Sequence, residues 1–373
     1  MAFDLESLRL IWWGILGVLM IGLALSEGLM LGVCMSLPVL GNSEQDRKEI
    51  IKPLVPLNLS NLAWLIALVA ITFSAWPVAY AVTFASFYPL LFLISLASLF
   101  RPIALYGFSA NVSDQWQQYV RKVLSISGLI PAALLGLLAG NLLKGIPFHL
   151  ESDMQIRFLG DFWGLFNLFS ILVTLTCLAL LAMYGAVFLQ LRTCDEMQQN
   201  ARAMVIRTAA LFLVFFAMTG LWITHLEGYH ISSEILPDAA SNPLAKFVKR
   251  GEGLWLDNYE HLPELWIIPA LAFIGGGLTL WFAKSDKTYW AMLASVLSVI
   301  MVVLTFGISM FPFLVPSNIS LNSSLTVWDS SASELNLRLL LWVAICALPL
   351  MAVCSRWLFR VFADEAKQAD SIE

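Results

Sequence analysis

The segment "GLALSEGLMLG" at residues 22–32 places one carboxylate, that of Glu27, inside an apolar run that begins near Leu10. The run extends to about residue 34, long enough for a helix to cross the hydrocarbon core of a bilayer. A charged side chain at that depth costs about 2.5–3.5 kcal/mol on insertion scales, so acids inside spans usually serve a function. The role of Glu27 depends on the kind of protein that surrounds it.

The composition is that of a membrane protein. The 373 residues are 59% hydrophobic and 13% charged, with a mean hydropathy of +0.80, whereas soluble domains are about 45–50% apolar and 25% charged. A soluble core of this size cannot hide the excess apolar surface. We expect an all-α polytopic membrane protein with a single integral membrane domain over residues 1–373, and no nucleic-acid partner.

Nine segments are apolar and long enough to span a bilayer. They are approximately residues 10–34, 57–76, 78–100, 123–143, 164–190, 205–225, 264–283, 289–312 and 338–359. The second and third are separated only by Trp76-Pro77, which predicts a tight hairpin.

The distribution of basic residues predicts the orientation. With nine spans, 14 of the 21 Lys and Arg residues fall on the side that holds the C-terminus and 7 on the other. The basic side is usually cytoplasmic, so we expect the N-terminus to face outward and the C-terminal tail, 360–373, to be cytoplasmic. The long loops 226–263 and 313–337 are then outward. With eight spans, the loops rich in Lys and Arg would fall on both sides of the membrane, so the clean separation supports nine spans.

Tryptophans lie near many predicted span ends, where amphipathic rings favour the headgroup level. We expect six of them to form aromatic belts that anchor the protein at the membrane–water interfaces: Trp12, Trp13, Trp76, Trp266, Trp290 and Trp357.

The residue types that bind cofactors do not fall inside the spans. A membrane b-type haem usually needs axial His or Met within spans, but the four histidines, His149, His225, His230 and His261, all fall in outward loops or at an outward end. The five cysteines form no metal-ligand spacing, and no P-loop, G-x-G-x-x-G or H-E-x-x-H pattern is present. We expect this chain to bind no haem, metal or nucleotide itself.

Polar residues gather at the predicted depth of Glu27, in the cytoplasmic third of the first span. The second span begins on the same side with "PLNLSNLAWL" at 56–65, which contributes Asn58, Ser60 and Asn61, and the third ends there at Arg101. Such a cluster can hold ordered water and relay protons. It can equally be a structural Glu27–Arg101 pair, or Glu27 can reach the interface and do neither.

The chain resembles subunit II of the bacterial cytochrome bd-type quinol oxidases over nearly its full length. The segments that carry the resemblance are "LRLIWWGILGVLMIG" at 8–22, "FRPIALYGF" at 100–108, "GNLLKGIPF" at 140–148, "ASNPL" at 240–244, "LWIIPAL" at 265–271 and, most specific, "MFPFLVPSNISLNSSLTVWDSSASELNL" at 310–337. Their order and spacing on a nine-span frame make the match specific.

The resemblance implies two four-helix bundles plus one peripheral helix, paired with a subunit I that carries haem b, haem d and the quinol-oxidising loop. It implies a complex in the bacterial inner membrane that oxidises quinol and reduces dioxygen to water with cytoplasmic protons. A small single-span accessory subunit and bound lipid are further expected partners. In this family subunit II itself carries no haem.

The resemblance also implies a proton route, and here the sequence departs from the family. The family pattern T-D-G-F-D-x-G reads Ser26-Glu27-Gly28-Leu29-Met30-Leu31-Gly32, so the second acid is lost. The pattern H-W-D-G-N-Q-V-W corresponds to the segment from Asn58 to Trp64, with Ser60 or a neighbour in place of the acid, while Arg101 is kept. A Ser hydroxyl cannot store a proton near neutral pH. Two explanations therefore stay open: the protons enter mostly elsewhere, or the route runs with Glu27 and water as its one titrating group. The bulky ring of Trp64 either lines an apolar path for dioxygen or packs against neighbouring helices.

Two other functions remain open. A transporter usually shows internal repeats, broken spans and several inward carboxylates, and this sequence has one carboxylate and no clear repeat. A membrane assembly or scaffold protein is the third alternative. A haem absorption band in the purified chain with its companions would distinguish the oxidase from both.

Overall fold

The computed structural model describes residues 4–41, 43–51, 54–107 and 114–370. Within these ranges the side chains of residues 44, 45, 48, 56, 57, 59, 60, 114 and 355–370 lie outside the description. The α-helices are α1 (Leu5–Leu40), α2 (Glu44–Ile51), α3 (Leu54–Ala75), α4 (Pro77–Ser86), α5 (Tyr88–Tyr106), α6 (Asp114–Lys144), α7 (Leu168–Arg192), α8 (Asp195–Ile223), α9 (Asp257–His261), α10 (Ile267–Lys284), α11 (Thr288–Met310) and α12 (Glu334–Asp370).

The membrane-spanning character of the chain is confirmed. Among the described residues, eight helical stretches are long and apolar enough to cross a membrane, in α1, α5, α6, α7, α8, α10, α11 and the first part of α12. Helix α3 has 22 residues, about 33 Å at 1.5 Å per residue, which also reaches across a hydrocarbon core. The fold is therefore an all-α polytopic membrane protein.

The predicted third span is two helices rather than one. Helix α3 ends at Ala75 and α4 begins at Pro77, as the hairpin prediction required, but α4 ends at Ser86 and α5 begins at Tyr88. Pro89 lies in the first turn of α5. Because proline has no N–H to donate and its ring crowds the preceding turn, a continuous helix is broken at this point.

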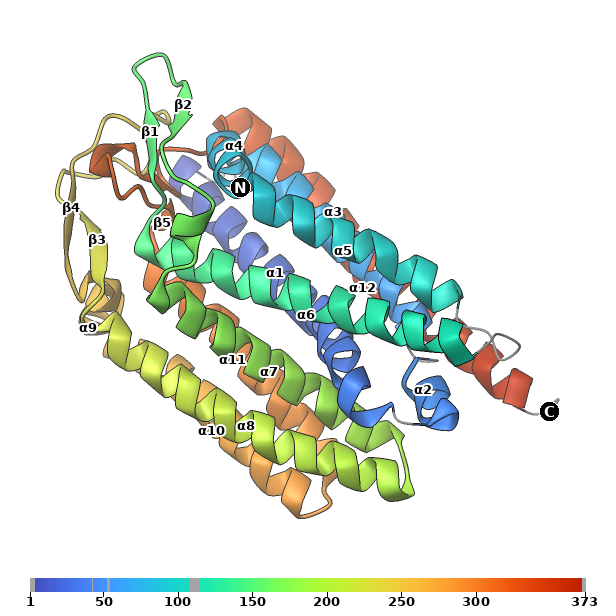
Figure 1. Ribbon diagram of the computed structural model, residues 1–373. Coiled ribbons are helices and arrows are strands. Elements are labelled where there is room, and N and C mark those ends of the chain that lie inside the picture. The colour runs from blue at the N-terminus through green and yellow to red at the C-terminus, as the bar shows by residue number, and fades with distance from the viewer. Residues whose placement is uncertain (1–3, 42, 52–53, 108–113, 371–373) are drawn as a thin grey trace.

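The helices form two four-membered bundles and one added helix (Figure 1). The first bundle contains α1, α3, the α4–α5 pair and α6, and the second contains α7, α8, α10 and α11. Helix α12 packs on the outside of the first bundle against α3. This is the arrangement that the family resemblance implied.

Glycines join the two bundles where α1 crosses α7. A Cβ added at Gly185 of α7 would overlap the backbone of Gly32 and Val33 on α1, and one at Gly32 would overlap the carbonyl of Leu181. Small residues allow helix backbones in membranes to approach closely and gain van der Waals contact. The Gly32–Gly185 crossing therefore fixes how the bundles sit against each other.

Short strands and 3₁₀ turns, which the all-α prediction did not include, lie in the loops. Within the described ranges they are three antiparallel pairs, β1 (Phe148–Leu150) with β2 (Ile156–Phe158), β3 (Glu227–Ile231) with β4 (Val248–Glu252), and β5 (Phe313–Val315) with β6 (Leu325–Thr326), and the turns η1 (Trp163–Leu165), η2 (Leu254–Leu256), η3 (Pro263–Trp266) and η4 (Leu321–Ser323). The strands lie at the end of the bundles where α1 begins, and α2 and the end of α12 lie at the opposite end (Figure 1).

The belt prediction is wrong for Trp12 and Trp76. Both are 1% exposed, and their indole Nε1 atoms donate to the carbonyls of Leu337 (3.1 Å) and Val327 (3.3 Å). The segment 313–337 folds back over these helix ends and covers the rings. Trp266 and Trp290 are exposed, as a belt position requires, and Trp357 lies outside the described side chains.

Arg9 ties the start of α1 to the loops. Its side chain is fully buried, and its Nε donates to Ser331 Oγ at 2.8 Å. The Nη2 atom donates to the carbonyl of Ala239 (3.0 Å) and to Ser241 Oγ (2.9 Å), and Nη1 donates to the carbonyl of Pro237. One guanidinium thus holds two loops that are about 90 residues apart in sequence against the first helix.

Candidate functional site

Glu27 lies on α1 inside the first bundle, and both of its carboxylate oxygens accept hydrogen bonds. Arg101 of α5 donates from Nη1 to Glu27 Oε1 at 2.6 Å, and Asn61 of α3 donates from Nδ2 to Glu27 Oε2 at 2.7 Å. The Arg101 side chain is 2% exposed and that of Glu27 is 17% exposed. A charge-assisted bond in such surroundings is stronger than one in water.

Arg101 also reaches a fourth helix. Its Nη2 donates to the main-chain carbonyl of Ser127 on α6 at 2.8 Å. In a regular helix the N–H four residues further on would bond that carbonyl, but here that residue is Pro131, which has no N–H. The carbonyl is therefore free to accept from Arg101, and α1, α3, α5 and α6 meet around one guanidinium.

Further buried polar atoms surround the pair. Among the described residues, Asn61 Oδ1 and Arg101 Nε are buried and have no hydrogen-bond partner in the protein. Buried polar atoms in folded proteins are nearly always bonded, and ordered water is the usual partner where protein groups are missing. The Glu27 site (Glu27, Asn61 and Arg101) thus has the chemistry of a small hydrated centre.

The structure brings together three of the six predicted site residues, namely Glu27, Asn61 and Arg101. Asn58 is half-buried on α3, and no hydrogen bond joins it to Glu27 among the described side chains. The side chain of Ser60 lies outside the described residues. Trp64 packs its ring against Gly22 of α1, where an added Cβ would overlap the indole carbons.

The residue of this centre that the sequence did not predict is Ser127. Ser127 contributes a carbonyl, which every residue type carries, so residue identity gives no signal for it. The signal was Pro131 four positions later, because a proline inside a span frees one carbonyl of the preceding turn. Met30, which replaces the second acid of the family pattern, is fully buried in the apolar core.

The four histidines lie in the loops and bond to loop or helix-end groups. His230 Nδ1 lies 3.0 Å from Asp257 Oδ2, and His261 Nδ1 lies 2.7 Å from the carbonyl of Asp257. His149 and His225 contact Ser323 and Thr224. Within the described residues, no three His, Cys, Asp or Glu side chains group as ligands for a metal ion.

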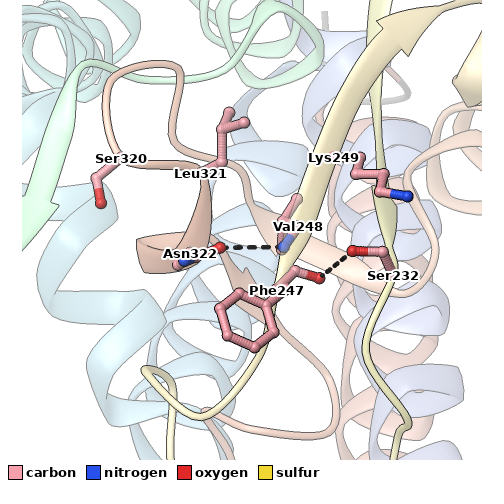
Figure 2. A pocket seen from close by; sticks show the side chains of 7 residues that line it. All are labelled: Ser232, Phe247, Val248, Lys249, Ser320, Leu321 and Asn322. Atoms are coloured by element: carbon pink, nitrogen blue, oxygen red, sulfur yellow. Dashed lines mark hydrogen bonds between the residues drawn. The ribbon is translucent and has the colours of Figure 1, made fainter.

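A surface pocket of about 600 Å³ lies among the loops, where β4 meets the segment 320–322 (Figure 2). Val248 N donates to Asn322 Oδ1 at 3.1 Å, and Ser232 Oγ donates to the carbonyl of Phe247 at 3.2 Å. Its lining side chains include one cation, Lys249, and no acid. These hydrogen bonds hold the loops together, and the lining contains no pair of side chains that could act as acid and base.

A second buried charge pair joins the same loops. Lys246 Nζ lies 2.8 Å from Asp329 Oδ2, and the two side chains are 8% and 12% exposed. Burial raises the pKa of Asp329 and lowers that of Lys246, while the attraction between the two opposes both changes. The pair connects the loop before β4 to the segment before α12.

Two helical bundles with one added helix, and a carboxylate–guanidinium pair buried in the first bundle, define a polytopic membrane protein. The sequence model of the family described as cytochrome bd terminal oxidase subunit II matches residues 8–362. The chain belongs to that family.

Individual relatives agree with the family assignment. The chain is 36% identical over 357 residues to cytochrome bd-I ubiquinol oxidase subunit 2 of Escherichia coli K12, covering 95% of this chain and 94% of that protein. It is 34% identical over 355 residues to a probable cytochrome oxidase subunit 2 of Haemophilus influenzae, with the same coverage. The bd oxidase structure from Geobacillus thermodenitrificans has a chain of the same fold, with a TM-score of 0.67, 17% identity, and coverage of 95% of this chain and 98% of that chain.

Proposed function

We propose that this chain is the haem-free subunit II of a bd-type quinol oxidase, in which it stabilises a haem-bearing subunit I. Family membership across residues 8–362 supports this proposal, and the position of every histidine outside the spans supports the assignment of haem b and haem d to the partner. The complex oxidises quinol and reduces dioxygen to water, with a small accessory subunit beside it.

Within that complex we propose that Glu27 serves proton uptake. The observation that supports this is the Glu27 site: a carboxylate held by Arg101 and Asn61, each of which has one further buried polar atom without a partner in the protein. A carboxylate can take up and release a proton, whereas the amide of Asn61 can only pass one through water. Met30 and the leucines around it offer no second titrating group at this level.

The orientation of the chain follows from the basic residues, with the start of α1 outward and the end of α12 cytoplasmic. The placement of these two helix ends at opposite ends of the bundles supports it (Figure 1). In this orientation Glu27 lies nearer the cytoplasmic end of α1, on the side from which the oxidase takes the protons for water formation.

The test is oxygen uptake by the purified complex with Glu27→Gln and Glu27→Ala. Proton uptake through Glu27 predicts slower turnover per haem in both variants, measured on the complexes that retain haem. Glu27→Asp, which keeps the carboxylate, should recover most of the rate. Unchanged turnover in Gln and Ala variants that keep their haem would show that Glu27 is not a relay.

A structural role of the Glu27–Arg101 pair gives a different pattern. The complex would then lose haem or fall apart in the Glu27→Ala variant, while each assembled molecule would turn over at the normal rate. Turnover must therefore be expressed per haem, so that assembly and proton transfer are measured separately. A stable complex without any haem band would contradict the oxidase assignment itself.

A further inference from the structure

The turn between α10 and α11 carries an exposed row of aromatic rings. Trp281 and Phe282 end α10, and Tyr289 and Trp290 begin α11. Ring centroids lie 5.0 Å apart for Trp281 and Phe282, 6.3 Å for Phe282 and Trp290, and 6.1 Å for Trp290 and Tyr289. Trp281, Tyr289 and Trp290 are 57%, 62% and 56% exposed, so this aromatic row faces outward from the bundle.

Two lysines lie on the turn between the aromatic pairs. Lys284 and Lys287 are exposed on the turn, and neither has an ion-pair partner among the described residues. The acid between them, Asp286, is in an ion pair with Arg202 of α8. Since Asp286 is neutralised by that partner, the turn presents two positive charges beside four rings.

This combination matches one chemical partner. The turn joins two membrane spans, so its residues lie at headgroup depth, where Trp and Tyr rings favour the interface. Lysine stems lie along apolar surface and carry their ammonium groups to the headgroups. A phosphodiester supplies the negative charge for both lysines, and its acyl chains cover the exposed rings. A zwitterionic lipid supplies no net charge.

We propose that the α10–α11 turn is a binding site for an anionic phospholipid, with the phosphodiester between Lys284 and Lys287 and the acyl chains against Trp281 and Trp290. The site lies at the end of the second bundle opposite the loops, as Figure 1 shows. It is separate from the Glu27 site, which lies in the first bundle, and it does not depend on proton uptake.

The test uses the intact complex reconstituted with equal amounts of phosphatidylglycerol and phosphatidylethanolamine, followed by native mass spectrometry of the lipids it retains. We expect retained phosphatidylglycerol to exceed phosphatidylethanolamine. Lys284→Gln and Lys287→Gln should each lower its occupancy by about fivefold, because one lysine near an anionic surface contributes roughly that factor. Lys284→Arg/Lys287→Arg, which keeps both charges, should retain the lipid.

Lys249→Gln, which removes one lysine at the loop end, is the matched control and should change nothing. Equal retention of the two lipids by the unaltered complex would overturn the proposal, as would full retention in both glutamine variants. Loss of a protein subunit from those variants would mean that the turn is a protein interface instead. Displacement of the lipid by inorganic phosphate at constant ionic strength would assign the site to free phosphate.

Discussion

Arg101 donates one Nη atom to Glu27 across 2.6 Å and the other to the carbonyl of Ser127 across 2.8 Å, so a single guanidinium joins α1, α5 and α6. With the bond from Asn61, every helix position of the first bundle contributes to the same centre. Because the guanidinium is buried, losing its counter-charge would leave an uncompensated cation among apolar side chains. The pair is therefore expected to matter for stability whether or not Glu27 also carries protons.

A double-mutant cycle separates the two roles. Arg101→Met alone should destabilise the complex by about 3 kcal/mol, because it leaves a partly buried carboxylate without its cation. Glu27→Met/Arg101→Met, which removes both charges, should regain most of that loss, since replacing a whole buried pair with apolar residues is close to neutral. Thermal unfolding of the purified complex measures this. A double variant as unstable as the sum of the Glu27→Met and Arg101→Met single variants would contradict this expectation. If Glu27 relays protons, turnover per haem should stay low in the double variant.

The Gly32–Gly185 crossing should not tolerate a methyl group. Gly185→Ala places a Cβ against the backbone of α1, which cannot move aside as a flexible side chain could. We expect a loss of about 2 kcal/mol from overpacking, measured by thermal unfolding. Gly220→Ala on α8 is the matched control, because nothing lies within 4 Å of the added Cβ, and it should be neutral or slightly stabilising. Equal effects of the two substitutions would refute the close-crossing account.

Tyr229 predicts how the loops respond to alkaline pH. Burial raises the pKa of this phenol from 10.0 to about 12, and its hydroxyl donates to the carbonyl of Lys144 at 3.2 Å. The folded state therefore keeps a proton that the unfolded state releases above pH 10. Stability should be fully present below pH 10 and fall between pH 10 and 12 by about 1.4 kcal/mol per pH unit from this residue.

Tyr229→Phe removes the titrating group and tests that slope. The variant should be somewhat less stable than the unaltered protein at pH 8, because the hydrogen bond to Lys144 is lost, and should lose less stability between pH 10 and 11.5. Melting temperatures across this range provide the measurement. Parallel pH curves for the two proteins would show that Tyr229 ionises equally in the folded and unfolded states.

Removing one member of the buried Lys246–Asp329 pair should destabilise the folded protein. Lys246→Met leaves the carboxylate of Asp329 buried, and we expect a loss of about 3–5 kcal/mol. Adding Asp329→Leu should restore most of it, because the pair is then gone as a whole. The comparison is made by thermal unfolding near pH 7, where both groups are charged in the unfolded chain. If Lys246→Met alone were neutral, the pair would not be sealed from water as the structure has it.

The sequence predicted most of the spans, because a long apolar run in a bilayer satisfies its backbone hydrogen bonds by forming a helix. It also placed Asn61 and Arg101 at the depth of Glu27, since span direction and position along a helix set depth. It did not predict the split at Phe87, although Pro89 was visible, nor the contribution of Ser127. The prediction for Trp12 and Trp76 was wrong because both rings are covered by a loop that follows them by more than 250 residues. Position near a span end carries no information about such a distant segment. The bundle arrangement followed only from the family resemblance.

The contacts of Arg9 have a consequence for how the protein is made. Helix α1, which carries Arg9, is held by Ser331 and by the loop at 237–241, and Trp12 on the same helix bonds to Leu337. These contacts therefore cannot form until the chain has been translated through residue 337. During synthesis α1 therefore remains without these partners until the segment that contains Ser331 and Leu337 has been made.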